Sequence, residues 1–154
     1  NFPSLTSKVV YVPNGLADLN FDKQVNPTFK NKIDSYLTST EIVFLYLGRL
    51  NKKKGLDLLV PAFNKLLLDF PNIKLIIAGP EGDFSEELTH IISGKSNILL
   101  LPSCIEWSKN YLFKKSDVFV LPSYSEGFSI AALEAISYGK ACIFSKNIGF
   151  LFPH

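Results

Sequence analysis

Two carboxylates eight residues apart mark the part of the sequence best suited to hold a polar ligand. Glu126 and Glu134 enclose the stretch EGFSIAALE, which follows the apolar run VFVLPS. The helix that starts between them is expected to bury four apolar residues, namely Ile130, Ala131, Leu133 and Ile136. An unpartnered carboxylate among such residues is costly. We therefore expect Glu134 to have a partner, either a nearby lysine or a polar ligand.

The residues around Glu126 predict a polar lip with backbone groups open to a ligand. Gly127 permits close approach, and the amide groups of Phe128, Ser129 and Ile130 stand at a helix start, where donors lack partners within the helix. Such donors suit a phosphate or sugar oxygen. Glu126 itself has two interpretations: it accepts hydrogen bonds from ligand hydroxyls, or it complements the dipole of the helix that follows.

A basic segment, GRLNKKKG, predicts an anion site after an earlier apolar run. It places Gly48, Arg49 and Lys54 ahead of a helix that begins near Gly55. Guanidinium and ammonium groups at a helix start suit a diphosphate, whereas Lys52 and Lys53 fit an ordinary solvated loop. The later turn AGPEGD contains Gly79, but it is a weak signal, since GxGxxG is absent from the chain.

The elements that must position these residues form an alternating pattern. Continuous apolar runs predict strands covered on both faces at Ile42–Leu47, Ile73–Ala78, Ile98–Leu101, Val118–Leu121 and, more weakly, Ala141–Ser145. Helical periodicity falls between them, and further elements are a strand at Lys8–Val12 and a short helix near Phe29–Leu37. This alternation predicts an α/β fold, a Rossmann-like parallel sheet with helices on both faces. The polar turns listed above would then share one edge of the sheet.

Composition bounds the remaining function classes. The 154 residues are 47% hydrophobic with a net charge of +2, which predicts one globular domain and gives no reason to expect nucleic acid as a partner. Cys104 and Cys142 are too few for a disulfide framework or a zinc site and are interpreted as core thiols in a reducing compartment. No apolar run approaches the ~18 residues of a membrane-spanning helix. His90 and His154 offer no Ser-His-Asp arrangement, and the Walker P-loop is absent.

Four segments together resemble the donor-binding domain of family 4 glycosyltransferases, retaining enzymes of GT-B architecture with two facing Rossmann-like domains. They are VPNGLAD (12–18), YLGRLNKKKGLDLL (46–59), LIIAGPEGD (75–83) and SDVFVLPSYSEGFSIAALEAISYGKACI (116–143). The last is the most specific, because its two glutamates are separated by seven residues after a strand-like phrase. The implied activity is transfer of a hexose-like sugar from a nucleoside diphosphate, such as a UDP- or GDP-sugar, to an unknown acceptor.

The resemblance also implies residue roles. Arg49 and Lys54 would bind the donor diphosphate and, with Glu126, carry catalysis; Glu126 would contact the transferred sugar and Glu134 the ribose hydroxyls. The other implied donor contacts are Gly48, Gly79, Ser103, Ile105, Gly127, Phe128, Ser129 and Ile130, with the loop from Ser103 to Ile105 at the nucleobase. Because the cations stabilise the leaving diphosphate, no metal or other cofactor is expected.

The extent of the resemblance predicts half an enzyme. Residues 1–40 correspond to an interdomain crossing and entry segment, and residues 41–154 to a Rossmann-like core without its closing elements. The absence of methionine also suggests a fragment. The partner domain that binds the acceptor is missing, so we expect donor binding without transfer. The implied location is the cytoplasm, with any peripheral membrane contact made by the missing half. The alternatives are a non-catalytic nucleotide-binding module of the same fold and a domain of another Rossmann-like enzyme.

Overall fold

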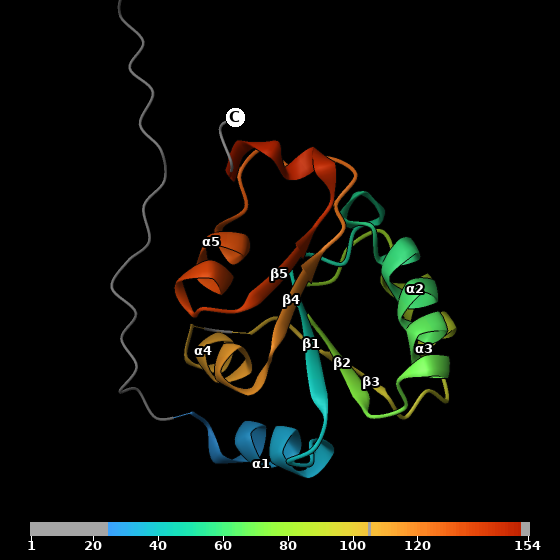
Figure 1. Cartoon of the computed structure of the whole chain (residues 1–154), viewed down its shortest axis with the longest axis vertical. Helices are drawn as coiled ribbons and strands as arrows, with labels where there is room; N and C mark the ends of the chain where they lie inside the picture. Colours follow the sequence, from blue (N-terminus) through green and yellow to red (C-terminus); the bar gives the residue numbers. More distant parts are fainter. Residues whose placement is uncertain (1–24, 105, 152–154) are drawn as a thin grey trace, which may run out of the picture.

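The computed structural model describes residues 25–104 and 106–151, and within them five parallel strands form one sheet (Figure 1). The strands are β1 (Ile42–Leu47), β2 (Ile73–Ala78), β3 (Ile98–Leu101), β4 (Val118–Leu121) and β5 (Ala141–Phe144). Their order across the sheet is β3-β2-β1-β4-β5. The first four predicted strands have the predicted bounds, and the fifth ends one residue earlier. The predicted strand Lys8–Val12 lies outside the described residues.

The central strands owe their continuous apolar sequences to burial on both faces. In β1 and β2, Leu45 pairs in register with Ile76, and both side chains are fully buried, as are the neighbouring Leu75 and Ile77. A strand covered on both sides gains by placing branched side chains at every position rather than at alternate ones. The expectation of a doubly covered parallel sheet is confirmed.

Helices cover the sheet on both sides (Figure 1). The helices α2 (Leu56–Asp69) and α3 (Ser85–Ile92) lie on one side, and α4 (Glu106–Lys115) and α5 (Ile130–Ser137) lie on the other. The helix α1 (Pro27–Tyr36) matches the short helix predicted near Phe29–Leu37 and precedes β1. Two short 3-10 helices complete the described elements, η2 (Lys52–Lys54) and η3 (Lys146–Leu151). None of the described helices combines the length and apolar character needed to cross a bilayer.

The buried face of α5 differs from the prediction. Ala132 and Ala135 are fully buried, whereas Ile130 is 49% exposed and Ile136 is 43% exposed. The small alanine side chains let α5 pack closely against β4 and β5 and turn the larger residues outward. The prediction of burial was therefore wrong for Ile130 and Ile136, while Ala131 and Leu133 are half-buried, and the burial of Glu134 needs a separate explanation.

The two cysteines are also less buried than predicted. Cys104 and Cys142 are free and half-buried, and both pack against the outside of the core. Cys104 lies in the loop after β3, and Cys142 lies on the edge strand β5. Neither position is covered on every side, so the interpretation of both as core thiols was wrong.

Candidate functional site

The carboxyl ends of β1, β2 and β3 meet the start of α5 around a cavity of about 300 Å³. Five predicted donor-site residues line it: Gly48, Gly79, Ser103, Ile130 and Glu134. Open α/β sheets bind ligands at this edge, where the loops after parallel strands gather. The strand order therefore brings together residues that are up to 86 positions apart in the chain.

Gly79 lies in the wall of this cavity, at a position where a side chain would collide with the neighbouring strand end. A Cβ atom at Gly79 would lie 1.9 Å from the carbonyl oxygen of Gly48. The amide group of Gly48 donates in turn to the carbonyl oxygen of Ala78 at 3.1 Å, which joins the ends of β1 and β2. The predicted turn glycine thus has a packing role, namely to let two strand ends approach each other beside the cavity.

Glu134 is paired with a lysine that the sequence did not single out. The Nζ atom of Lys109 lies 2.5 Å from Oε1 of Glu134, and both side chains line the cavity. The expectation that Glu134 has a partner is confirmed, in the form of the nearby lysine. The signal for Lys109 in the sequence was the apolar pair Leu112 and Phe113, three and four residues later. Residues at these spacings share one face of a helix, and both are buried in the structure.

Lys54 and Glu126 come together as a second ion pair. Lys54 Nζ lies 2.5 Å from Oε2 of Glu126, although the two residues are 72 positions apart. The hydroxyl group of Ser123, which is fully buried, donates to the same carboxylate oxygen at 3.2 Å. The side chains of Lys54 and Glu126 are 17% and 11% exposed, so this pair is more enclosed than an ordinary surface salt bridge.

The turn that carries Lys54 is locked against the loop after β4. Gly55 has a φ of +74°, and a Cβ atom there would lie 2.1 Å from the carbonyl oxygen of Pro122. The amide group of Tyr124 donates to the carbonyl oxygen of Lys53 at 2.9 Å. These backbone contacts, rather than the side chains alone, set the distance between Lys54 and the loop that holds Glu126.

Arg49 lies on the other side of the same turn. Its side chain is exposed, and Nη1 donates to the carbonyl oxygen of Glu81 at 3.4 Å, in the loop after β2. The phenol of Tyr46, fully buried, donates to the carbonyl oxygen of Arg49 at 3.0 Å. Burial, together with the nearby charge of Glu126, raises the pKa of Tyr46, which keeps this donor protonated. Arg49 and Lys54 therefore come from one turn but contact different loops.

The polar segment after Glu126 only partly has the free backbone donors that were predicted for it. Ser129 caps α5, because its hydroxyl oxygen accepts a hydrogen bond from the amide group of Ala132 at 3.2 Å. Phe128 and Ile130 donate no backbone hydrogen bond within the described part of the chain. Glu126 lies before this cap and not in the first turn of α5, so its interpretation as a helix-dipole partner was wrong.

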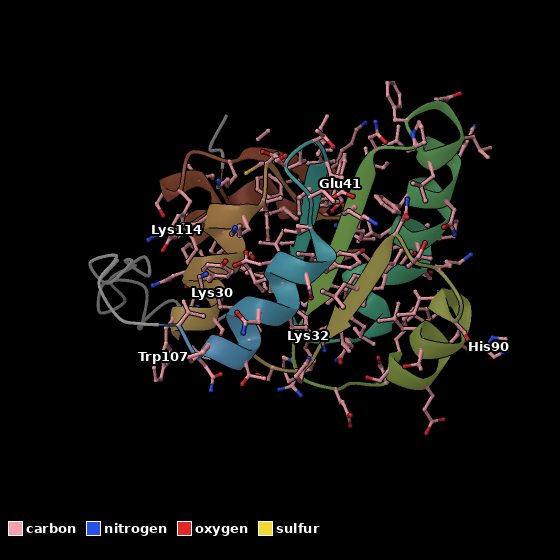
Figure 2. All side chains as sticks on the ribbon, turned by 90° about the horizontal axis from the view of Figure 1, so that it is seen from below. Lys30, Lys32, Glu41, His90, Trp107 and Lys114 are labelled. Atoms are coloured by element: carbon pink, nitrogen blue, oxygen red, sulfur yellow. The ribbon has the colours of Figure 1, made fainter. Side chains whose placement is uncertain are left out.

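The remaining predicted positions lie apart from the cavity or outside the description. Gly127 and Phe128 are not among the lining residues, and neither are Arg49, Lys54 and Glu126. Ile105 lies outside the described residues. Figure 2 shows the side chain of His90 at the outer edge of the molecule, directed away from the sheet. His90 was interpreted as a surface or core residue rather than a base, and it is exposed.

A larger hollow lies at the opposite end of the sheet. It has a volume of about 410 Å³ and is walled mainly by apolar side chains, among them Ile42, Phe44, Leu66 and Phe70. The single charged residue in its wall is Asp69. A site for a phosphorylated or hydroxyl-rich ligand needs donors, acceptors and positive charge, and this hollow offers few of them, whereas the cavity at the carboxyl edge contains Lys109, Glu134 and Ser103.

The chemistry available at the carboxyl edge is binding and charge stabilisation. The thiol of Cys104 lines the cavity, but burial raises its pKa to about 11, so it is protonated at neutral pH. Residues 25–104 and 106–151 contain no group of three or more His, Cys, Asp or Glu side chains placed to hold a metal ion. The expectation that no metal or cofactor is needed stays a prediction.

Comparison with known proteins gives a consistent family. The family model described as glycosyl transferases group 1 matches residues 28–151. An uncharacterised glycosyltransferase of Methanocaldococcus jannaschii is 32% identical over 98% of this chain and 39% of its own length. The UDP-Gal:alpha-D-GlcNAc-diphosphoundecaprenol alpha-1,3-galactosyltransferase of Escherichia coli is 31% identical over 92% of this chain and 38% of its own length.

A solved structure supports the fold. HepE of Anabaena, in complex with UDP and glucose, superposes with a TM-score of 0.69 at 23% identity, covering 90% of this chain and 39% of HepE. This likeness concerns the arrangement of strands and helices. The chain thus spans less than two-fifths of the length of each of these three proteins.

Proposed function

This chain belongs to the glycosyl transferases group 1 family, and we propose that it is the donor-binding half of a retaining, family 4 type glycosyltransferase of GT-B architecture. The observation that carries the proposal is the convergence at one sheet edge of a cavity holding Glu134 and Lys109 with the adjoining pair of Glu126 and Lys54. The proposed reaction transfers a hexose-like sugar from a nucleoside diphosphate sugar to an acceptor.

The donor would lie across this edge with its nucleoside in the cavity. Glu134 accepts hydrogen bonds from the ribose hydroxyls, and Gly48 and Gly79 form the part of the cavity wall against which the nucleoside lies. Ser103 contacts the base, together with Ile105. The cavity volume of about 300 Å³ falls within the range of small-molecule sites.

The diphosphate and the sugar would lie towards β4 and α5. Arg49 and Lys54 supply positive charge to the diphosphate, while Glu126 accepts hydrogen bonds from the transferred sugar. The amide groups of Phe128 and Ile130, together with those of Gly127 and Ser129, supply further donors.

Charge stabilisation would be the main contribution to catalysis. When the bond between the anomeric carbon and the diphosphate breaks, its electron pair leaves with the diphosphate, and negative charge grows on the oxygen nearest the cations. Lys54 is paired with the carboxylate of Glu126 in the structure, so Arg49, which contacts a backbone carbonyl instead, supplies the cation free to follow the leaving group. No residue of this chain is assigned to the acceptor, which the other domain would bind.

The free thiols Cys104 and Cys142 support a reducing compartment, and the proposal includes a cytoplasmic location at the membrane face. The E. coli relative is named for a UDP-sugar donor and a lipid-linked acceptor, and the Anabaena structure contains UDP. These names support testing UDP-sugars first, beside GDP-sugars. The alternative of a non-catalytic nucleotide-binding module predicts binding of the nucleotide without any requirement for the sugar.

The decisive experiment is calorimetric titration of the chain with UDP-, GDP- and ADP-sugars and with the free nucleotides. We expect one nucleotide class to bind and Glu134→Ala and Arg49→Ala each to weaken binding about tenfold or more. Glu87→Ala, at an exposed position on α3, is the control. Unchanged affinity in both site variants would remove the proposed roles, and glycosyl transfer by the chain alone would contradict the assignment as half an enzyme.

A further inference from the structure

Lys109 contacts the residue proposed to select the ribose. We propose that Lys109 is a positioning residue that holds Glu134 in the orientation needed to distinguish a ribonucleotide from a 2′-deoxyribonucleotide. This inference rests on the proposed function, which assigns Glu134 to the ribose hydroxyls. It adds a residue from α4 to a site otherwise built from the strand ends and α5.

The geometry of the pair leaves part of the carboxylate available. Lys109 Nζ donates to Oε1 of Glu134, and no described group donates to Oε2. An ionised carboxylate has about four acceptor positions on its two oxygens. Glu134 can therefore remain bonded to Lys109 while its second oxygen accepts from ligand hydroxyls.

The position of the two residues makes the lysine a structural determinant of that orientation. Glu134 is on α5 and Lys109 is on α4, so their contact ties the two helices together beside the cavity. Their side chains are 15% and 29% exposed, which leaves each partly desolvated. A glutamate without this partner would lower its energy by turning towards water.

The Glu134 carboxylate that Lys109 holds determines how strongly a ligand hydroxyl is recognised. Hydrogen bonds to an ionised acceptor are about twice as strong as those between neutral groups. A ligand without the 2′-hydroxyl would leave a carboxylate oxygen without its ligand donor in a partly desolvated site, and such unmatched groups are what produce discrimination. With Lys109 removed, Glu134 loses its fixed orientation, and the two nucleotides should bind more equally.

A direct contact between Lys109 and the diphosphate predicts a different result. Both ribo- and deoxyribonucleotides carry the same diphosphate, so the loss of a phosphate contact would weaken their binding by the same factor. The ratio of the two dissociation constants therefore separates a positioning role from a phosphate-binding role.

The experiment measures the Kd of UDP and 2′-deoxy-UDP for the chain by calorimetry, with GDP and 2′-deoxy-GDP in parallel. We expect the unaltered chain to prefer the ribonucleotide about tenfold or more. Lys109→Ala and the bulkier Lys109→Met should reduce this ratio to about threefold or less, while Lys109→Arg should largely restore it. Lys114→Ala, on the same helix but outside the cavity wall, should keep the full ratio.

Glu134→Gln separates the two ways in which the experiment can fail. If Glu134→Gln leaves the ratio unchanged, the proposed role of Glu134 is wrong. If Glu134→Gln abolishes the ratio but neither Lys109→Ala nor Lys109→Met changes it, only the inference about Lys109 is overturned. Adding Lys109→Ala to Glu134→Gln should change the ratio no further, because the lysine acts through the glutamate. Equal weakening of both nucleotides by Lys109→Ala would instead assign the lysine to the diphosphate.

Discussion

The two lysine–carboxylate pairs at the carboxyl edge have the same contact distance, 2.5 Å, but different surroundings. Glu126 receives Lys54 and Ser123 on a single oxygen, and the pair is formed by turns whose backbones are locked together. Glu134 receives Lys109 alone, from a neighbouring helix, and faces a cavity. The first carboxylate is held by the protein from two directions, whereas the second keeps an oxygen for a ligand. Equal distances therefore do not imply equal roles.

The largest expected effect comes from neutralising each carboxylate in the glycosyltransferase of which this chain is proposed to be the donor-binding half. Under the proposed function, Glu126→Gln should lower kcat about 100-fold with little change in KM, because Glu126 and Lys54 would act where charge develops. Glu134→Gln should raise KM about tenfold and leave kcat nearly unchanged, because the proposed contact with the ribose would be equally strong in the ground and transition states. Initial-rate kinetics with saturating acceptor would measure both parameters. If Glu126→Gln changed mainly KM and Glu134→Gln mainly kcat, the roles assigned to the two carboxylates would have to be exchanged.

A methyl group added beside each pair tests how tightly the two regions are packed. Gly79→Ala places a Cβ atom 1.9 Å from the Gly48 carbonyl oxygen, and we expect a loss of about 1–3 kcal/mol in the free energy of unfolding. Gly127→Ala meets no atom within 4 Å and is the matched control. Urea unfolding measures both variants; equal stability for the two would mean that the strand ends separate without cost.

The hydroxyl group that distinguishes the Glu126 pair should contribute a smaller amount. Ser123 is buried and donates to Glu126, so Ser123→Ala should cost about 1 kcal/mol. The exposed Ser137 donates to the backbone carbonyl of Glu134, and Ser137→Ala should cost less than about 0.5 kcal/mol. Thermal unfolding would compare them. A Ser137 effect as large as that of Ser123 would remove the distinction between the two carboxylates.

The smallest effect concerns the thiol beside the Lys109 pair. Because burial raises the pKa of Cys104 to about 11, its thiolate fraction and its alkylation rate should still rise with pH between 8 and 11. The charge of Lys109 lowers this pKa, so Lys109→Ala should slow alkylation at a fixed pH. Bound nucleotide should protect Cys104 several-fold and leave Cys142 on β5 unprotected. Mass spectrometry after iodoacetamide treatment reports both sites, and equal protection would place the ligand elsewhere.

Most of the sheet could be predicted from the sequence, because a strand that is buried on both faces has a continuous run of apolar residues. Runs such as IVFLYL and IKLIIA have no polar alternation, and their bounds could be read without knowledge of their partners. The same reasoning failed for α5, where the choice between Ala132 and Ile130 as the inward residue depends on how closely the helix packs on the sheet. Side-chain size alone did not reveal that distance.

Parts of the site were predictable for a related reason. Gly79, Ser103 and Glu134 follow or face strand ends, and strand ends converge in any parallel sheet. Lys109 was missed because it belongs to a helix whose inward face could be identified only from Leu112 and Phe113. The separation of Arg49 from Lys54 was also missed, since it depends on which loop each side of the turn contacts.

The contact between Gly55 and Pro122 limits how this edge can move. Gly55 packs against the Pro122 carbonyl, and the amide group of Tyr124 donates to the carbonyl oxygen of Lys53, so the turn after β1 and the loop after β4 are joined through their backbones. A hinge motion that closed a partner domain over the donor would have to rotate both segments together. The junction fixes the main-chain positions from which Lys54 and Glu126 extend, so a diphosphate bound as proposed would separate the two charges by side-chain rotation alone.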